Sequence, residues 1–139
     1  MSDPQVKERL PWEPAIYEHK AALIGRSPEE VSHSANLLTA AILEEIRIYQ
    51  ADFVTVGIDV YNVEAQACGA QVVTTGPQAC PEIPIPPWSV ERLPRELEVP
   101  AIPREGRFQL LLDAARRVTD IFTGSSSMFV DTSRPWPPT

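Results

Sequence analysis

The stretch FVTVGIDVYNVEAQACG, Phe53 to Gly69, decides how this 139-residue chain is expected to fold. Its first part, Phe53–Ile58, is a short apolar run rich in valine and isoleucine, which predicts a strand covered on both faces. Asp59 follows at once, and α/β barrels and open α/β sheets place ligand-binding and catalytic groups at the carboxyl ends of such strands. Asp59 is therefore the leading candidate for a catalytic residue. The plainer alternative is that Asp59 caps the short helix predicted over 60–68.

A long helix is predicted before this strand. Ser27 supplies an N-cap hydroxyl, the next residue is a proline suited to the first helical position, and Glu30 completes a capping box. Apolar residues then recur every three or four positions as far as about Gln50, which predicts one amphipathic helix. An earlier helix is predicted over 17–24 and is ended by Gly25. A helix followed closely by a buried strand is half of a parallel α/β unit.

Prolines and apolar periodicity divide the rest of the chain. Eight prolines fall in the segment 77–103, a density that forbids a helix or a central strand through most of it. The interleaved apolar side chains indicate a long loop laid against the body. A second apolar stripe predicts a helix over 106–122. The resulting organisation is an extended arm (1–14), an α/β domain (15–122) and an irregular tail (123–139).

Composition limits the partners of the protein. Twelve lysines and arginines against nineteen acidic residues give a net charge of -7, which argues against nucleic acid or an anionic membrane surface as the main partner. The sequence shows neither a long apolar run nor a signal-peptide pattern, so we expect no membrane contact and a cytoplasmic protein. Cys68 and Cys80 lack the spacing of a zinc site, so we expect no metal ligands and two reduced thiols. We expect Cys68 to be buried in the short helix. A brief strand is predicted after that helix, over 70–74.

Five segments occur in this order along the chain: WEPAIYEH (12–19), SPEE (27–30), FVTVGIDVYNVEAQACGAQVV (53–73), WSVERLP (88–94) and EGRFQLLLDAARRV (105–118). Together they resemble the amino-terminal part of the uroporphyrinogen decarboxylase superfamily. Within it, the chain resembles the corrinoid-dependent methyltransferase branch more than the true decarboxylases. The resemblance implies a (β/α)₈ TIM barrel, a fold that takes about 250 residues. We therefore expect a truncated α/β fold that holds the amino-terminal part of such a barrel.

The resemblance also implies roles for individual residues. Asp59 matches the aspartate with which the decarboxylases contact pyrrole nitrogens. Glu64 matches the acidic segment that the methyltransferase branch places at this point, and it is a candidate substrate-binding residue. Further substrate-binding candidates, each with an ordinary surface or packing role as the alternative, are Tyr17, His19, Tyr61 and Asn62.

Two departures from the family pattern narrow the expected activity. True decarboxylases carry an RxxGRY-type motif that holds the porphyrin carboxylates, whereas the corresponding segment here, 17–27, reads YEHKAALIGRS. The zinc of the methyltransferases is held by His and Cys residues that have no counterpart in this sequence. The first hypothesis is a relative of the methyltransferases, with cobalamin as the implied cofactor, a corrinoid protein as a partner and little catalysis on its own.

The second hypothesis is a non-catalytic module. A partial barrel leaves strand edges unpaired, and a homo-oligomer or a docked partner would cover them. Tight binding of cobalamin or another tetrapyrrole would favour the first hypothesis. A dimer that binds neither would favour the second.

Overall fold

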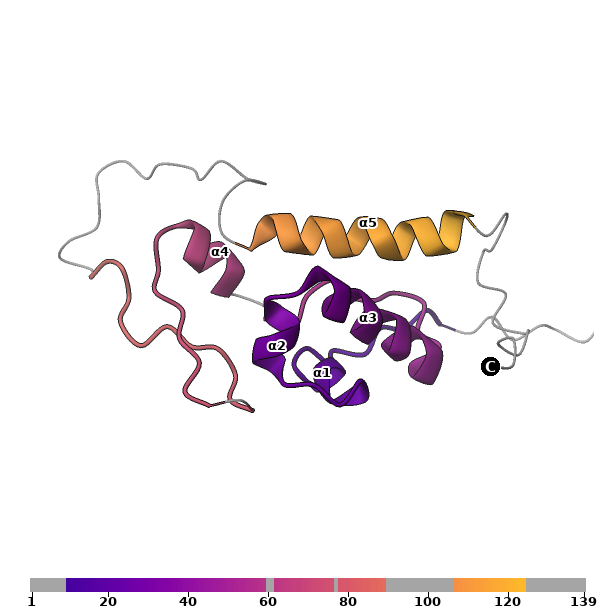
Figure 1. The fold of residues 1–139 in the computed structure, drawn as a ribbon, viewed down its shortest axis with the longest axis horizontal. Coiled ribbons are helices and arrows are strands. Elements are labelled where there is room, and N and C mark those ends of the chain that lie inside the picture. The colour runs from indigo at the N-terminus through magenta and orange to yellow at the C-terminus, as the bar shows by residue number, and fades with distance from the viewer. Residues whose placement is uncertain (1–9, 60–61, 77, 90–106, 125–139) are drawn as a thin grey trace, which may run out of the picture.

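The computed structural model describes residues 10–59, 62–76, 78–89 and 107–124. The described part is mostly helical and contains no strand; its only ladder-type pairing is an antiparallel bridge between Val73 and Glu82. No described helix is both long and apolar enough to cross a bilayer. The helices, labelled in Figure 1, are α1 (His19–Leu23), α2 (Pro28–Ser32), α3 (Ala35–Tyr49), α4 (Asn62–Ala67) and α5 (Phe108–Gly124).

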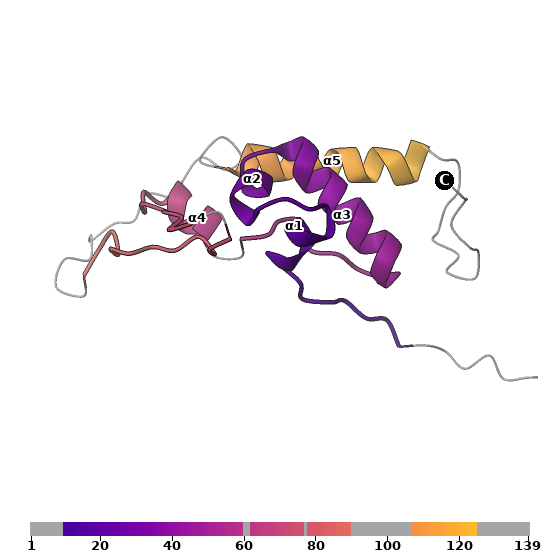
Figure 2. The ribbon, with the colours of Figure 1, turned by 60° about the horizontal axis from the view of Figure 1, so that its bottom comes forward.

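Helix α3 is the centre of the packing. It contacts α1, α2 and α5, and α5 runs along one side of the group formed by α1, α2 and α3 (Figures 1 and 2). Helix α4 lies apart from this group, near the amino-terminal end of α5. Apolar side chains from α1, α2, α3, α5 and the segment before Asp59 form one buried cluster, and burial of such surface is the main force that holds helices together. Its members are Ala21, Val31, Leu38, Ala41, Ile42, Ile58, Ala114 and Val118.

The predicted helix signals around Gly25 and Ser27 are confirmed. Gly25 has φ +66, and its N–H donates to Ala22 O while the next N–H donates to Ala21 O, which is the Schellman pattern that ends α1. Ser27 Oγ accepts from the N–H of Glu30, and the Glu30 carboxylate accepts from the Ser27 N–H, which completes the capping box of α2.

The prediction of one continuous helix as far as Gln50 is wrong. Helix α2 ends after one turn, where both the Ser32 hydroxyl and the His33 ring contact the Glu29 carbonyl oxygen at 2.9 Å. Ser34 is extended, with φ -138 and ψ 113, and its hydroxyl accepts from the N–H of Leu37 to begin α3. A second N-cap therefore restarts the helix, because serine stabilises a helix start better than a helix interior.

The prediction of a strand covered on both faces at Phe53–Ile58 is also wrong for the described residues. Val54 and Val56 pack against the core and Ile58 is buried, whereas Phe53 is 60% exposed and Thr55 is exposed. The side chains alternate inward and outward as in a strand, so only one face is covered. No neighbouring strand is present among the described residues to complete the hydrogen bonding that defines a sheet.

Smaller differences concern the boundaries around this segment. Cys68 is exposed rather than buried, because α4 ends at Ala67 and the chain turns there. The expected brief strand over 70–74 is reduced to the single bridge at Val73. The segment 78–89 contains no helix, as its prolines predict, and Trp88 is 39% exposed. Tyr61, the remaining apolar residues predicted in the loop, and most of the arm and tail lie outside the described residues.

Candidate functional site

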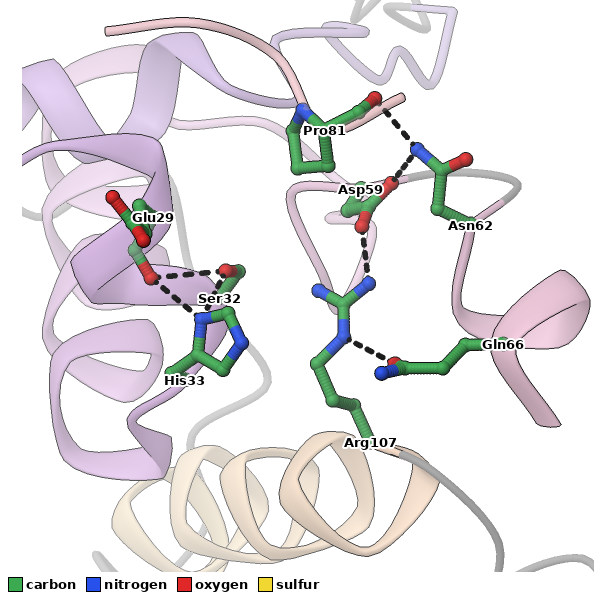
Figure 3. Close-up of polar contacts among 8 residues, drawn as sticks. All are labelled: Glu29, Ser32, His33, Asp59, Asn62, Gln66, Pro81 and Arg107. Atoms are coloured by element: carbon green, nitrogen blue, oxygen red, sulfur yellow. Dashed lines mark hydrogen bonds and ion pairs between the residues drawn. The ribbon is translucent and has the colours of Figure 1, made fainter. Parts of the chain in front are cut away.

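The carboxylate of Asp59 is buried and held from two sides. The residue is 6% exposed, and it follows Gly57 and Ile58 at the end of the segment that packs on α3 and α5. Asp59 Oδ1 accepts a hydrogen bond from Asn62 Nδ2 at 2.6 Å. Asp59 Oδ2 forms an ion pair with Arg107 Nη2 (Figure 3). Among the described residues, each carboxylate oxygen therefore has one donor.

Arg107 reaches this carboxylate from a distant part of the sequence. It lies directly before α5, and its Nε donates to Gln66 Oε1 of α4 at 2.9 Å. The side chains of Arg107 and Asp59 are 10% and 3% exposed, so the pair is nearly excluded from water. The guanidinium thus connects the end of the 53–58 segment, α4 and the start of α5.

Asn62 connects the carboxylate to the proline-rich loop. Its Nδ2 donates both to Asp59 Oδ1 and, at 2.8 Å, to the carbonyl oxygen of Pro81, which is buried (Figure 3). Both N–H groups of this amide are therefore used. The loop is fixed over Asp59 by a backbone acceptor, which a proline retains although it has no N–H.

Cys80 lies beside this site. The negative charge of Glu18 raises the pKa of the Cys80 thiol, with smaller contributions in the same direction from burial, a hydrogen bond to Glu18 and the charge of Asp59. The exposed thiol of Cys80 is therefore favoured in its protonated, weakly nucleophilic form.

Of the residues predicted to bind substrate, Asn62 contacts the Asp59 carboxylate, whereas Tyr17, His19 and Glu64 form no hydrogen bond or ion pair with it in the described part of the chain. His19 is exposed on α1, and its Nε2 lies 3.2 Å from Tyr49 Oη. Tyr17 precedes α1 with φ +22 and is half-buried, and Glu64 is exposed on α4. Tyr61 lies outside the described residues. Helix α4 begins at Asn62 in the described part of the chain, and the two positions between Asp59 and α4 lie outside it.

A second buried ion pair lies in the helical core. Lys20 Nζ of α1 is 3.0 Å from Glu45 Oε2 of α3, and both side chains are 1% exposed. Lys20 Nζ also donates to Thr55 O at 2.7 Å, while Glu45 Oε1 has no hydrogen-bond partner among the described residues. Burial lowers the pKa of Lys20, and the charges of Glu45 and Glu13 oppose that change. This pair fixes the 53–58 segment to α1 and α3.

Comparison with known proteins assigns the family. The sequence model of uroporphyrinogen decarboxylase matches residues 5–137. The chain belongs to the uroporphyrinogen decarboxylase family. None of the curated proteins and none of the solved structures matches it significantly. The family predicts a barrel, which the described helices and the single extended segment neither complete nor contradict.

Three polar residues of this uroporphyrinogen decarboxylase family member were not predicted from sequence, although two carried a signal. Arg107 places a positive charge at the start of α5, where the helix dipole disfavours it, which indicates that the guanidinium has a partner elsewhere. Glu45 lies three residues after Ile42, on the apolar face of α3, so its burial requires a cation. Gln66 carried no such signal.

Proposed function

We propose that this chain binds a corrinoid through Asp59 as part of a corrinoid-dependent methyl transfer. The observation that carries the proposal is the buried Asp59 carboxylate, which each of two protein donors engages on a different oxygen. An ionised carboxylate has about four acceptor positions, of which the described residues engage two, and we assign the others to N–H groups of a ligand. The amide side chains at the edge of a corrin ring are donors of this kind.

The charges around the site favour a corrinoid over a porphyrin. The edge of a uroporphyrin carries carboxylates, and binding them in a protein interior requires cationic partners. In the described part of the chain, every lysine and arginine already has a partner: five form ion pairs with carboxylates, and the sixth donates to an amide oxygen. The pairs are Lys20–Glu45, Arg26–Glu30, Arg47–Glu44, Arg107–Asp59, Arg116–Asp113 and Arg117–Asn36.

The cations in the segment that corresponds to the decarboxylase arginine motif are also already paired. Its two cations are Lys20, buried against Glu45, and Arg26, which pairs with Glu30 at the surface. Neither contacts Asp59. This arrangement supports the methyltransferase branch rather than porphyrin decarboxylation.

Zinc, which the methyltransferase branch uses, does not fit the described residues. Among them, no three His, Cys, Asp or Glu side chains come together as a metal site. The negative charge of Glu18 raises the pKa of Cys80, which disfavours the thiolate that zinc binds. The proposal therefore assigns corrinoid binding to this chain and no step through zinc.

The test is a titration of the purified chain with hydroxocobalamin, followed by visible absorbance, in parallel with uroporphyrin. We expect saturable binding of hydroxocobalamin that Asp59→Asn weakens, and weaker binding of uroporphyrin. Asp113→Asn is the matched control, because Asp113 is a carboxylate paired with an arginine at the surface. Tighter binding of uroporphyrin would favour the decarboxylase activity instead, and binding of neither compound would refute the proposal. Thermal unfolding of each variant checks that the fold is kept.

The exposure of Phe53 favours the non-catalytic module as a second candidate. This residue is 60% exposed on a segment that no described strand covers. Pairing of the segment with a second copy would bury it. Light scattering of the chain with and without hydroxocobalamin distinguishes the two functions, since a dimer that ignores the corrinoid and becomes a monomer in Phe53→Ser supports the module.

A further inference from the structure

The orientation of the Asp59 carboxylate depends on a chain of contacts that begins on α4. Gln66 accepts from Arg107 Nε at 2.9 Å, and Arg107 Nη2 engages Asp59 Oδ2. A guanidinium is planar, so two fixed contacts on one edge determine both its position and the direction of its N–H bonds. Figure 3 shows Arg107 between the two side chains, with Nε toward Gln66 and one terminal nitrogen toward Asp59.

The contact of Asn62 holds the other oxygen of the same carboxylate. Because Asn62 Nδ2 also donates to the carbonyl of Pro81, the donor is itself fixed by the backbone. With one donor on each oxygen, rotation about the Cβ–Cγ bond of Asp59 would break both contacts. The remaining acceptor positions of the carboxylate consequently point in defined directions.

We infer that Arg107 is the positioning residue for Asp59 and that Gln66 in turn orients Arg107. This inference rests on the proposed function, because it concerns how Asp59 is presented to a corrinoid. Arg107 acts through Asp59 and does not contact the ligand. A purely stabilising ion pair would need the charge of Arg107 but not the second contact to Gln66.

A substitution of Arg107 by lysine distinguishes a positioning role from a role that needs the positive charge alone. Arg107→Lys keeps the positive charge but loses the planar edge that joins Gln66 to Asp59. We expect Arg107→Lys to raise the Kd for hydroxocobalamin about tenfold, which is ~1.4 kcal/mol, and Gln66→Leu to raise it by a smaller factor. Arg116→Lys, in an exposed pair on the same helix, is the matched control and should leave the Kd unchanged.

The decisive comparison repeats Arg107→Lys in an Asp59→Asn background. If Arg107 acts through Asp59, the substitution changes the Kd there by much less than in the wild type, because the group it positions is already altered. An equal change in both backgrounds would overturn the inference. If Asp59→Asn weakens binding while Arg107→Lys does not, the inference fails and the proposed function stands. If the wild type does not bind hydroxocobalamin, both the inference about Arg107 and the proposed function are refuted.

A ligand-free measurement tests the same positioning. Carboxyl ¹³C NMR of aspartate-labelled protein gives a signal for Asp59 that is assigned by its loss in Asp59→Asn. We expect the Asp59 signal of Arg107→Lys and Gln66→Leu to be shifted from that of the wild type, since the carboxylate then samples more than one rotamer and the signal is their average. An Asp59 signal that is the same in all three proteins would contradict the inference, whatever the titration shows.

Discussion

Replacement of Lys20 by methionine should destabilise the protein more than any surface substitution. The change leaves the Glu45 carboxylate, which is fully buried, without the one charged partner that it has among the described residues. Breaking a buried ion pair from one side typically costs about 3–5 kcal/mol, because an uncompensated charge remains in the interior. A domain of this size has about 5–15 kcal/mol of stability in total. Lys20→Met should therefore remove a large fraction of it.

Removing both charges should recover most of the free energy of unfolding that Lys20→Met loses. In Lys20→Met/Glu45→Leu no charge remains to be desolvated, and apolar replacement of a buried pair is often neutral or stabilising by about 1–4 kcal/mol. The double variant still loses the donor to Thr55 O, and leaving this partly buried carbonyl unpaired costs at most about 1–3 kcal/mol. These opposing effects place the double variant within roughly 2 kcal/mol of the wild type.

The assay is urea unfolding followed by circular dichroism at 222 nm, with the free energy of unfolding obtained by linear extrapolation. The control is Arg116→Met, which breaks an exposed pair whose side chains are 66% and 40% exposed and should cost less than about 1 kcal/mol. The reasoning would be refuted by a loss of less than about 1 kcal/mol in Lys20→Met, or by a double variant as unstable as the two single losses added together. If Lys20→Met does not fold, recovery of folding in the double variant still measures the coupling.

Three further outcomes are expected. Gly57→Ala should cost about 1–3 kcal/mol in urea unfolding, because φ +125 strains any residue with a Cβ, whereas Gly76→Ala, at a position of ordinary φ, should cost less. The hydrogen bond from the Ser27 backbone N–H lowers the pKa of the Glu30 carboxyl group. The ionised carboxylate therefore stabilises the fold above the unfolded-state pKa of about 4.3, and this stability is lost as the pH falls through the lower folded-state pKa. Glu30→Gln should make the decline of Tm with falling pH less steep over that range, and an unchanged decline would contradict the reasoning. Because Glu18 raises the pKa of Cys80, Glu18→Gln should speed alkylation of Cys80 by iodoacetamide at neutral pH, and mass spectrometry of the modified peptide would show an equal rate if the assignment is wrong.

The helix ends could be predicted because their signals are local. The capping box at Ser27 and the glycine at position 25 act through residues within one turn of themselves, and the structure contains both. The restart of the helix at Ser34 was not predicted, because the apolar periodicity runs through this position without a break. Periodicity reports which face is buried, and it does not report whether the backbone is continuous.

The segment 53–58 could be predicted only in part. Its alternation of inward and outward side chains follows from its own residues, and Val54, Val56 and Ile58 do face the core. A strand, however, is defined by hydrogen bonds to another segment, and the sequence of this stretch does not specify that partner. The family predicts further strands, and the described residues of this chain do not contain them.

The candidate site shows the same division between local and distant information. Asn62 lies three residues from Asp59, so the proximity of the two could be expected from sequence. Arg107 and Gln66 are separated from each other by 41 residues and meet only through the fold. The guanidinium occupies the amino-terminal end of α5, where a positive charge is unfavourable to the helix. This unfavourable position is offset only because the buried Asp59 carboxylate lies next to it, so the start of α5 and the site have to form together. A substitution that weakens the contact of α5 with α3 should for this reason also loosen Asp59, although it lies far from the carboxylate.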